Sequence, residues 1–145
     1  MAFDQIKLEN FLSALAIDHG HLGLVVTDGE VGTVALPLIK NGLASIDLDA
    51  QTDPDAVLSL LLDCAKRSRW CRLNLVDGSL PGRVYNQLRN LSVTGHLDVA
   101  QIGAKGMGQE VRWPAEAKVV LVANSAILEQ ISVPTFLNLF GPVLR

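Results

Sequence analysis

The chain has 145 residues, of which 49% are apolar and 19% charged, and its net charge is −3. This length fits a single domain, 1–145, large enough to bury a core without disulfides or metal ions. The acidic balance argues against nucleic acid as a partner, and no apolar run is long enough to span a bilayer. The charged fraction lies below the usual value of about 25%, so we expect some apolar surface to contact a protein partner.

Two cysteines are too few for a disulfide framework, and the first residues lack the pattern of a signal peptide. These features favour a cytoplasmic protein.

Apolar side chains in residues 3–17 recur at helical spacing and predict an amphipathic helix within the segment 1–19. This helix is expected to lie on the core or on another subunit. The apolar residues proposed for its packed side are Phe3, Ile6, Phe11, Leu12, Leu15 and Ile17. The apolar run 21–26 then predicts a buried strand.

The pattern from Gly32 to Leu43 predicts a helix, although Pro37 inside it would kink or shorten that helix. Residues 44–49 alternate as a strand, and Asp53 with Pro54 predicts the start of a helix that continues through Arg67. The basic residues around its end are interpreted as completing its C-terminal turn, where cations suit the helix dipole. They are Lys66, Arg67, Arg69 and Arg72.

A third strand is predicted at 71–76, followed by a helix from Ser79 to Thr94. The segment 96–113 predicts a hairpin insertion with arms 96–102 and 110–113. A strand at 118–123 and one or two short helices in 125–140 come next. Continuous apolar strands alternating with helices predict a three-layer α/β sandwich with a mostly parallel five-stranded sheet.

The segment Gly29–Leu36 comes after the first strand and is similar to a phosphate-binding loop whose working residues are replaced. A working loop needs glycine for close backbone approach, a lysine for charge, and a hydroxyl for magnesium. Val34, Ala35 and Leu36 occupy those three places, which argues against triphosphate binding of the usual kind. Asp28-Gly29 is also interpretable as a plain tight turn.

The run from His21 to Arg145 resembles the α/β core of the AAA+ ATPases, a P-loop NTPase family, and is nearest to magnesium-chelatase-like members with a hairpin before the fourth strand. Gly29, Gly32 and Thr33 match positions of the family's G-P-P-G-T-G-K-T loop. Asp77 stands where the family's Asp helps to hold magnesium, and Asn124 where an Asn positions water. The resemblance implies that these five residues form a residual cofactor-binding rim.

The chain departs from the family at the reactive positions. Gly78 replaces the Glu that activates water, and Leu139-Phe140 replaces an Arg-Phe pair whose Arg reaches the neighbouring subunit. The sequence ends at Arg145, before the helical lid that the family places next. The resemblance therefore implies a pseudo-ATPase that lacks the lid and has neither catalytic residues nor a bound cofactor.

Two functions remain open from the sequence. The first is a catalytically inactive AAA+-like scaffold that acts through protein–protein assembly, as a homo-oligomer or in a complex with a protein partner such as an active ATPase. The alternative is a small-molecule or nucleotide-binding domain that uses the carboxyl ends of the strands around Asp28, Gly29, Asp77 and Asn124. An enzyme with an unrecognised nucleophile is a third interpretation.

Other candidate groups are few. His19 and His21 could offer imidazoles to a metal, but no cysteine lies at ligand spacing, so no metal site is predicted. Cys64 has no local motif of a nucleophile and is interpreted as a buried thiol.

Overall fold

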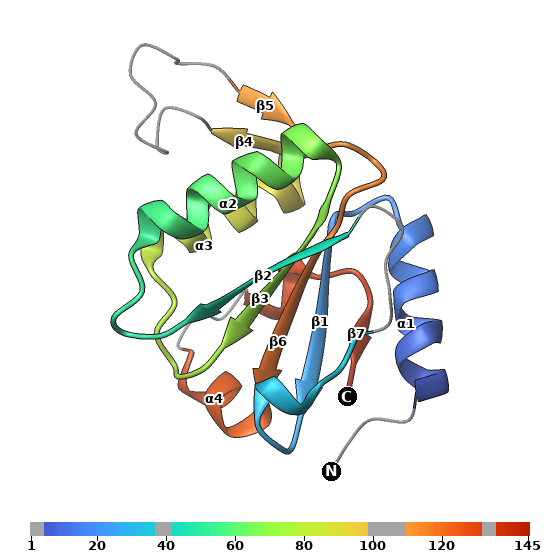
Figure 1. Ribbon diagram of the computed structural model, residues 1–145, viewed down its shortest axis with the longest axis vertical. Helices are drawn as coiled ribbons and strands as arrows, with labels where there is room; N and C mark the ends of the chain where they lie inside the picture. Colours follow the sequence, from blue (N-terminus) through green and yellow to red (C-terminus); the bar gives the residue numbers. More distant parts are fainter. Residues whose placement is uncertain (1–4, 37–41, 99–109, 132–135) are drawn as a thin grey trace.

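The computed structural model describes residues 5–36, 42–98, 110–131 and 136–145 (Figure 1). The elements in chain order are α1 (Gln5–Ile17), β1 (Leu22–Thr27), the 3₁₀ turn η1 (Val31–Thr33), β2 (Leu43–Leu48), α2 (Pro54–Arg67), β3 (Trp70–Leu75), α3 (Gly82–Thr94), β4 (His96–Asp98), β5 (Glu110–Arg112), β6 (Val119–Asn124), α4 (Ser125–Gln130), the 3₁₀ turn η3 (Phe136–Leu139) and β7 (Val143–Leu144).

Five strands form one sheet in the order β2-β3-β6-β1-β7, and every neighbouring pair is parallel. The residues of the three inner strands, β3, β6 and β1, are mostly apolar and buried, as expected of parallel strands that are covered on both faces. The predicted five-stranded sheet is therefore confirmed. Since all strands run the same way, the loops after β1, β3 and β6 lie at one edge of the sheet.

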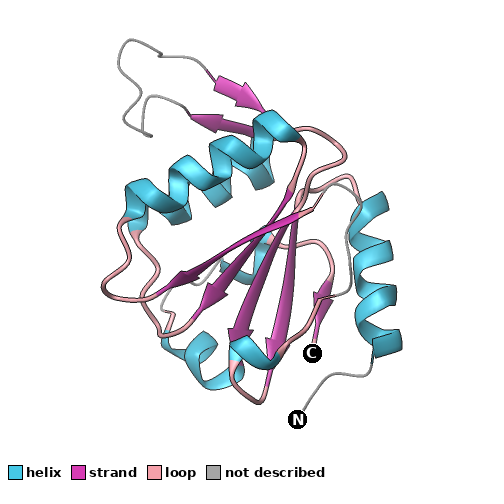
Figure 2. Cartoon of the chain, in the orientation of Figure 1, coloured by secondary structure: helices cyan, strands magenta, loops and turns pink. Residues whose placement is uncertain are grey.

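Helices cover both faces of this sheet, which makes the three layers that were predicted (Figure 2). Alternate residues of β1 divide between the faces: Leu24 and Val26 belong to the core with α2 and α3, whereas Val25 belongs to the core with α1. The α1 side also contains the η1 residue Val31.

The predicted N-terminal helix is present, but its packed side differs from the expectation. The buried residues of α1 are Leu8, Phe11, Leu12 and Leu15, which recur at positions i, i+3, i+4 and i+7. Ile6 and Ile17 were expected on this side and are exposed instead, because each lies about half a helical turn away from the buried stripe.

The predicted helix over 32–43 is wrong. Residues 31–33 form a single 3₁₀ turn, Val34 is extended with φ −79° and ψ 108°, and Leu43 already belongs to β2. β-branched side chains at 31, 33 and 34 disfavour helix, and Pro37 disfavours helical geometry at Leu36. Residues 37–41 lie outside the described part of the chain.

Most of the remaining elements agree with the sequence prediction. α2 ends at Arg67 and has Asp53 as its N-cap, whose side chain accepts from Asp55 N. α3 begins three residues after Ser79 and ends at Thr94, and the following Gly95 caps it with φ +74°. Segment 125–140 contains the short helix α4 and the turn η3, while 132–135 lie outside the described residues.

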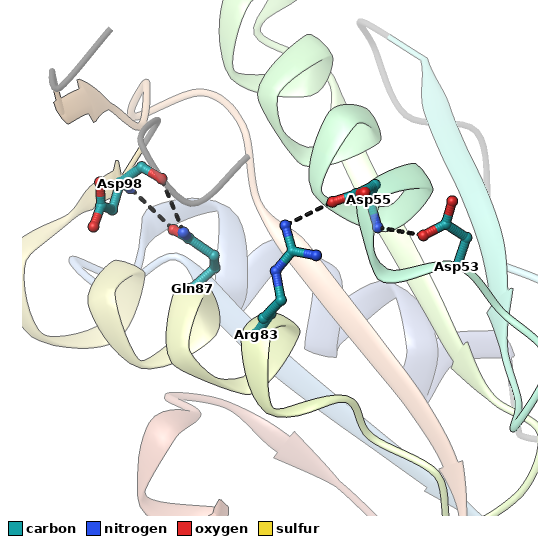
Figure 3. A network of polar contacts seen from close by, with 5 residues as sticks. All are labelled: Asp53, Asp55, Arg83, Gln87 and Asp98. Carbon is teal, nitrogen blue, oxygen red and sulfur yellow. Dashed lines mark hydrogen bonds and ion pairs between the residues drawn. The ribbon is translucent and has the colours of Figure 1, made fainter. Parts of the chain in front are cut away.

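The predicted hairpin is present as antiparallel β4 and β5, with its tip, including Lys105 and Met107, outside the described residues. Gln87 on α3 fixes its base: the side chain donates to Asp98 O at 3.0 Å and accepts from Asp98 N at 2.9 Å (Figure 3). Arg83 on the same helix pairs with Asp55 of α2 at 2.6 Å. Polar contacts therefore join α2, α3 and the hairpin.

Close packing of α1 on β1 depends on Gly23. A Cβ at this position would lie 2.8 Å from Leu15 Cδ2 and 2.8 Å from Phe11 Cζ, and both side chains are buried. Gly23→Ala should therefore lower the free energy of unfolding by about 1–2 kcal/mol, because overpacking outweighs the gain in strand propensity. Urea unfolding measures this change.

Gly32→Ala is the matched control for this substitution, since a Cβ at Gly32 meets nothing within 4 Å. It should change stability by no more than about 0.5 kcal/mol. Equal effects of the two substitutions would contradict the packing of α1 described above.

Candidate functional site at the carboxyl edge of the sheet

The loops after β1 and β6 meet at the carboxyl edge of the sheet. Asn124 Nδ2 donates to Gly29 O at 2.7 Å and to Asp28 O at 3.3 Å, and Ser125 Oγ lies 3.3 Å from Asp28 Oδ1. This is the edge at which ligands bind in open α/β sheets. Two of the five residues proposed from the sequence, Gly29 and Asn124, are thus in contact.

Both ends of the Asn124 carboxamide make hydrogen bonds within the protein. Its Oδ1 accepts from Ala126 N at 2.8 Å and so caps α4, while its Nδ2 holds the turn after β1. An Asn that positions water would need one of these groups. Here both bind the protein's own backbone.

Asp77 lies just beyond β3 and makes a different set of contacts. Its Oδ1 accepts from Ser79 N at 2.8 Å and its Oδ2 from Ala50 N at 3.1 Å. The hydrogen bond from the Ser79 amide is the largest cause that lowers the pKa of this carboxyl. Asp77 therefore ties the loops before α2 and α3 to the end of β3 rather than contacting Gly29 or Asn124.

Gly32 and Thr33 lie in the η1 turn, where the backbone amides bond within the loop. Thr33 N donates to Glu30 O at 3.0 Å, Val34 N donates to Val31 O at 3.2 Å, and Gly29 N donates to Thr27 Oγ1 at 3.1 Å. A phosphate cradle needs such amides to converge on the ligand. These three amides are already satisfied within the loop.

Side chains of the same loop are anchored in the core on the α1 side. Val31 is 8% exposed and Val34 is 3% exposed, and both belong to the cluster that contains Leu8 and Val120. Val34 is the residue that the sequence analysis set against a glycine of a phosphate-binding loop. Its burial explains why a β-branched residue is accommodated there: the loop packs onto the sheet instead of opening toward a ligand.

The guanidinium of Arg72 holds this loop from the face of β3. Its Nη1 donates to Val34 O at 2.6 Å and its Nη2 to Val31 O at 2.9 Å, while its Nε donates to Asn74 Oδ1 at 2.6 Å. The residue is only 9% exposed. Burial lowers the pKa of Arg72, and the nearby Asp47 carboxylate partly opposes that shift.

Asn74 extends the polar network to β2. Its Nδ2 donates to Ser45 Oγ at 3.1 Å and to Asp47 Oδ1 at 2.9 Å. Two hydrogen bonds through the Asn74 amide therefore connect the Asp47 carboxylate to the Arg72 guanidinium, and each bond polarises the other. Arg72, Asn74, Ser45 and Asp47 together form what we call the sheet-face network.

Arg72 is the residue that sequence analysis missed. Its assignment to the basic end of α2 is wrong, since it lies within β3, whereas Arg67 does pair with Asp63 at 2.9 Å as a helix-end residue should. The available signal was the alternation of Arg72 and Asn74 along an otherwise apolar strand, which puts both on one face.

The chain directly after β1 also lacks the helix terminus on which many phosphate sites depend. An anion at a helix N-terminus gains from free amides and the helix dipole. Residues 28–36 contain one 3₁₀ turn and no α-helix. The described loop therefore provides no such terminus.

At the opposite edge of the sheet, Lys118 is buried and fixes the end of α1. Its Nζ donates to Asp18 O at 2.8 Å and to Gly20 O at 2.6 Å. Burial and the Lys118 charge lower the pKa of His21, whose Nδ1 has no hydrogen-bond partner. Among the described residues, no three His, Cys, Asp or Glu side chains are grouped as a metal site.

The two cysteines lie in the core, away from this edge. Cys64 and Cys71 are both fully buried, their thiols hydrogen-bond each other, and Cys64 Sγ lies 3.9 Å from Trp70 O. The hydrogen bond that the Cys71 thiol makes to Cys64, together with burial, raises the pKa of Cys71. Buried thiols of this kind are unreactive.

No protein-family model matches the chain, and no curated protein matches its sequence. Within the described ranges, none of the helices combines the length and the apolar character needed to cross a membrane.

Loss of the Arg72 side chain should leave Val34 O and Asn74 Oδ1 without this donor, and Val31 O with only the hydrogen bond from Val34 N. Arg72→Met should therefore lower the free energy of unfolding by about 2–4 kcal/mol. Arg89→Met is the control, because Arg89 is exposed on α3 and should tolerate the change within about 0.5 kcal/mol. Urea unfolding of both variants measures the difference, and equal stability would contradict an anchoring role for Arg72.

Proposed function

We propose that this protein is a catalytically inactive, AAA+-like α/β module that acts through protein–protein assembly. The observation that carries the proposal is the inward-packed loop after β1. The amides of Gly29, Thr33 and Val34 donate to nearby oxygens of the protein, the Val31 and Val34 side chains are buried, and Arg72 holds the carbonyls of both valines.

The remaining groups of the edge support the same interpretation. Asn124 and Asp77 are engaged with the protein's own backbone. Position 78, where the resemblance places a general base, is packed against α4: a Cβ there would lie 2.7 Å from Gln130 Oε1 and 3.0 Å from Gln130 Cβ. A glutamate at this position would have to displace Gln130.

The replaced loop residues now serve the fold. Leu36 packs against the α1-side core, and Val34 is part of it. Hydrocarbon at these positions stabilises the layer between α1 and the sheet and provides neither a cation nor a metal-binding hydroxyl. Catalysis of phosphoryl transfer depends on such charged groups. We therefore infer that the protein acts through the surface of its rigid α/β fold and not through catalysis.

Protein assembly is favoured over small-molecule binding because apolar side chains remain on the surface while the polar groups of the edge are internally satisfied. Within the described ranges, the exposed large apolar residues are Ile6, Ile17, Val76, Val93, Leu137 and Val143. A small-molecule site would instead require convergent polar groups that face an open cavity. The partner in the proposal is another protein, either a copy of this chain or an active ATPase.

Calorimetric titration with ATP, ADP and GTP in the presence of magnesium tests this proposal. We expect no binding at concentrations up to about 1 mM, because the loop after β1 packs its Val31 and Val34 side chains into the core and has no lysine at the loop's cation position, where Ala35 stands. ATP turnover should equal the buffer background and should be the same in Asp77→Asn. Micromolar binding would instead favour a small-molecule site, and hydrolysis that Asp77→Asn abolishes would show an active ATPase.

A further inference from the structure

The flank of α1 next to β7 combines the exposed residues Lys7, Asn10 and Ala14 with the buried Phe11. Lys7, Asn10, Phe11 and Ala14 line a groove of about 370 Å³ against Pro142, Val143 and Leu144. They recur at helical spacing and therefore form one stripe along α1. Ile17 lies three positions after Ala14, so it extends this stripe, and its side chain is 85% exposed.

β7 is the edge strand beside this flank (Figure 1). Leu24 N of β1 donates to Pro142 O at 3.1 Å, and in a parallel ladder the next residue has its N–H and C=O on the other side. The N–H and C=O of Val143 therefore point away from the sheet. Within the described part of the chain, no strand pairs with this outer side.

The two faces of the sheet are both apolar at this edge. Val143 is in register with Leu24 and so lies on the face opposite α1, where it is 41% exposed, whereas Leu144 is in register with Val25 and packs on the α1 side. A partner at this edge would therefore contact a helix on one face, a backbone edge in the middle, and Val143 on the other face.

We propose that a second copy of this chain occupies this edge, with antiparallel pairing of the two β7 strands and side-by-side contact of the two α1 helices. A two-fold axis through the β7 pair makes the contact symmetric. The N–H of Val143 in each copy donates to the C=O of Val143 in the other copy, and the α1 flank of one copy contacts that of the other. This inference specifies the assembly partner of the proposed function, and its evidence is independent of the loop after β1.

The charges of α1 are complementary in this arrangement. Across the two-fold axis the helices run antiparallel, so Lys7 of each copy lies toward the C-terminal end of the other helix, where Asp18 comes after Ile17. Cations stabilise helix C-termini. Pro142 has no N–H and Arg145 is charged, so pairing of the two β7 strands centres on Val143. The contact between the two α1 helices therefore supplies much of the apolar area of the interface.

Light scattering coupled to gel filtration, at about 10–200 µM to bracket the Kd expected for a small interface, tests the inference. The expected mass at the upper concentration is twice the chain mass of 15.6 kDa. Ile17→Lys and Val143→Lys should each weaken the dimer at least about tenfold, because they place like charges near the two-fold contact. Val93→Lys is the control: Val93 is 74% exposed on α3 and should not matter.

Crosslinking provides a second readout that does not depend on affinity alone. Val143→Cys places a thiol beside the two-fold axis, so a short bismaleimide should link two copies, whereas Val93→Cys should not be linked. The buried Cys64 and Cys71 should not react.

A monomer at the upper concentration would overturn the inference, and so would a dimer that neither lysine variant weakens. Either result would leave the nucleotide titrations untouched. Conversely, nucleotide binding by a protein that dimerises as expected would contradict the proposed inactivity and leave this interface standing.

Discussion

The contact between the Arg72 guanidinium and the carbonyls of Val31 and Val34 is the interaction on which the rest of this account depends. It joins the middle of β3 to the turn after β1 across the face of the sheet. A buried cation is costly unless its donors are satisfied, and here three of its nitrogens donate hydrogen bonds. The loop in turn needs Arg72, because Val34 O would otherwise lose its donor and Val31 O would keep only the hydrogen bond from Val34 N.

This arrangement determines the character of the carboxyl edge. A parallel sheet brings its loops to one edge whatever their sequence, and in many α/β proteins that edge binds a ligand. In this protein Asn124 caps α4 and clips the turn after β1, and Asp77 binds the amides of Ala50 and Ser79. The Asn124 carboxamide and the Asp77 carboxylate thus stabilise the loops at this edge.

Much of the fold could be predicted from the sequence, because continuous apolar strands and capped helices carry strong local signals. The meeting of Gly29 with Asn124 is explained by the same reasoning, since parallel strands bring their ends together. The helix expected over 32–43 was wrong because a 3.6-residue pattern does not reveal β-branched and proline effects on the backbone. The burial of Arg72 was missed because it depends on a loop 38 to 41 residues earlier in the chain, which local spacing cannot indicate.

Hydrogen exchange of the backbone amides of Thr33 and Val34, measured by NMR in the native protein, shows whether the loop after β1 is closed. We expect exchange at least about a hundredfold slower than in an unstructured peptide, because both amides donate within a loop that Arg72 and the buried valines hold closed. Exchange at the unstructured rate would contradict this expectation, since the loop would then be open and its amides available to a ligand.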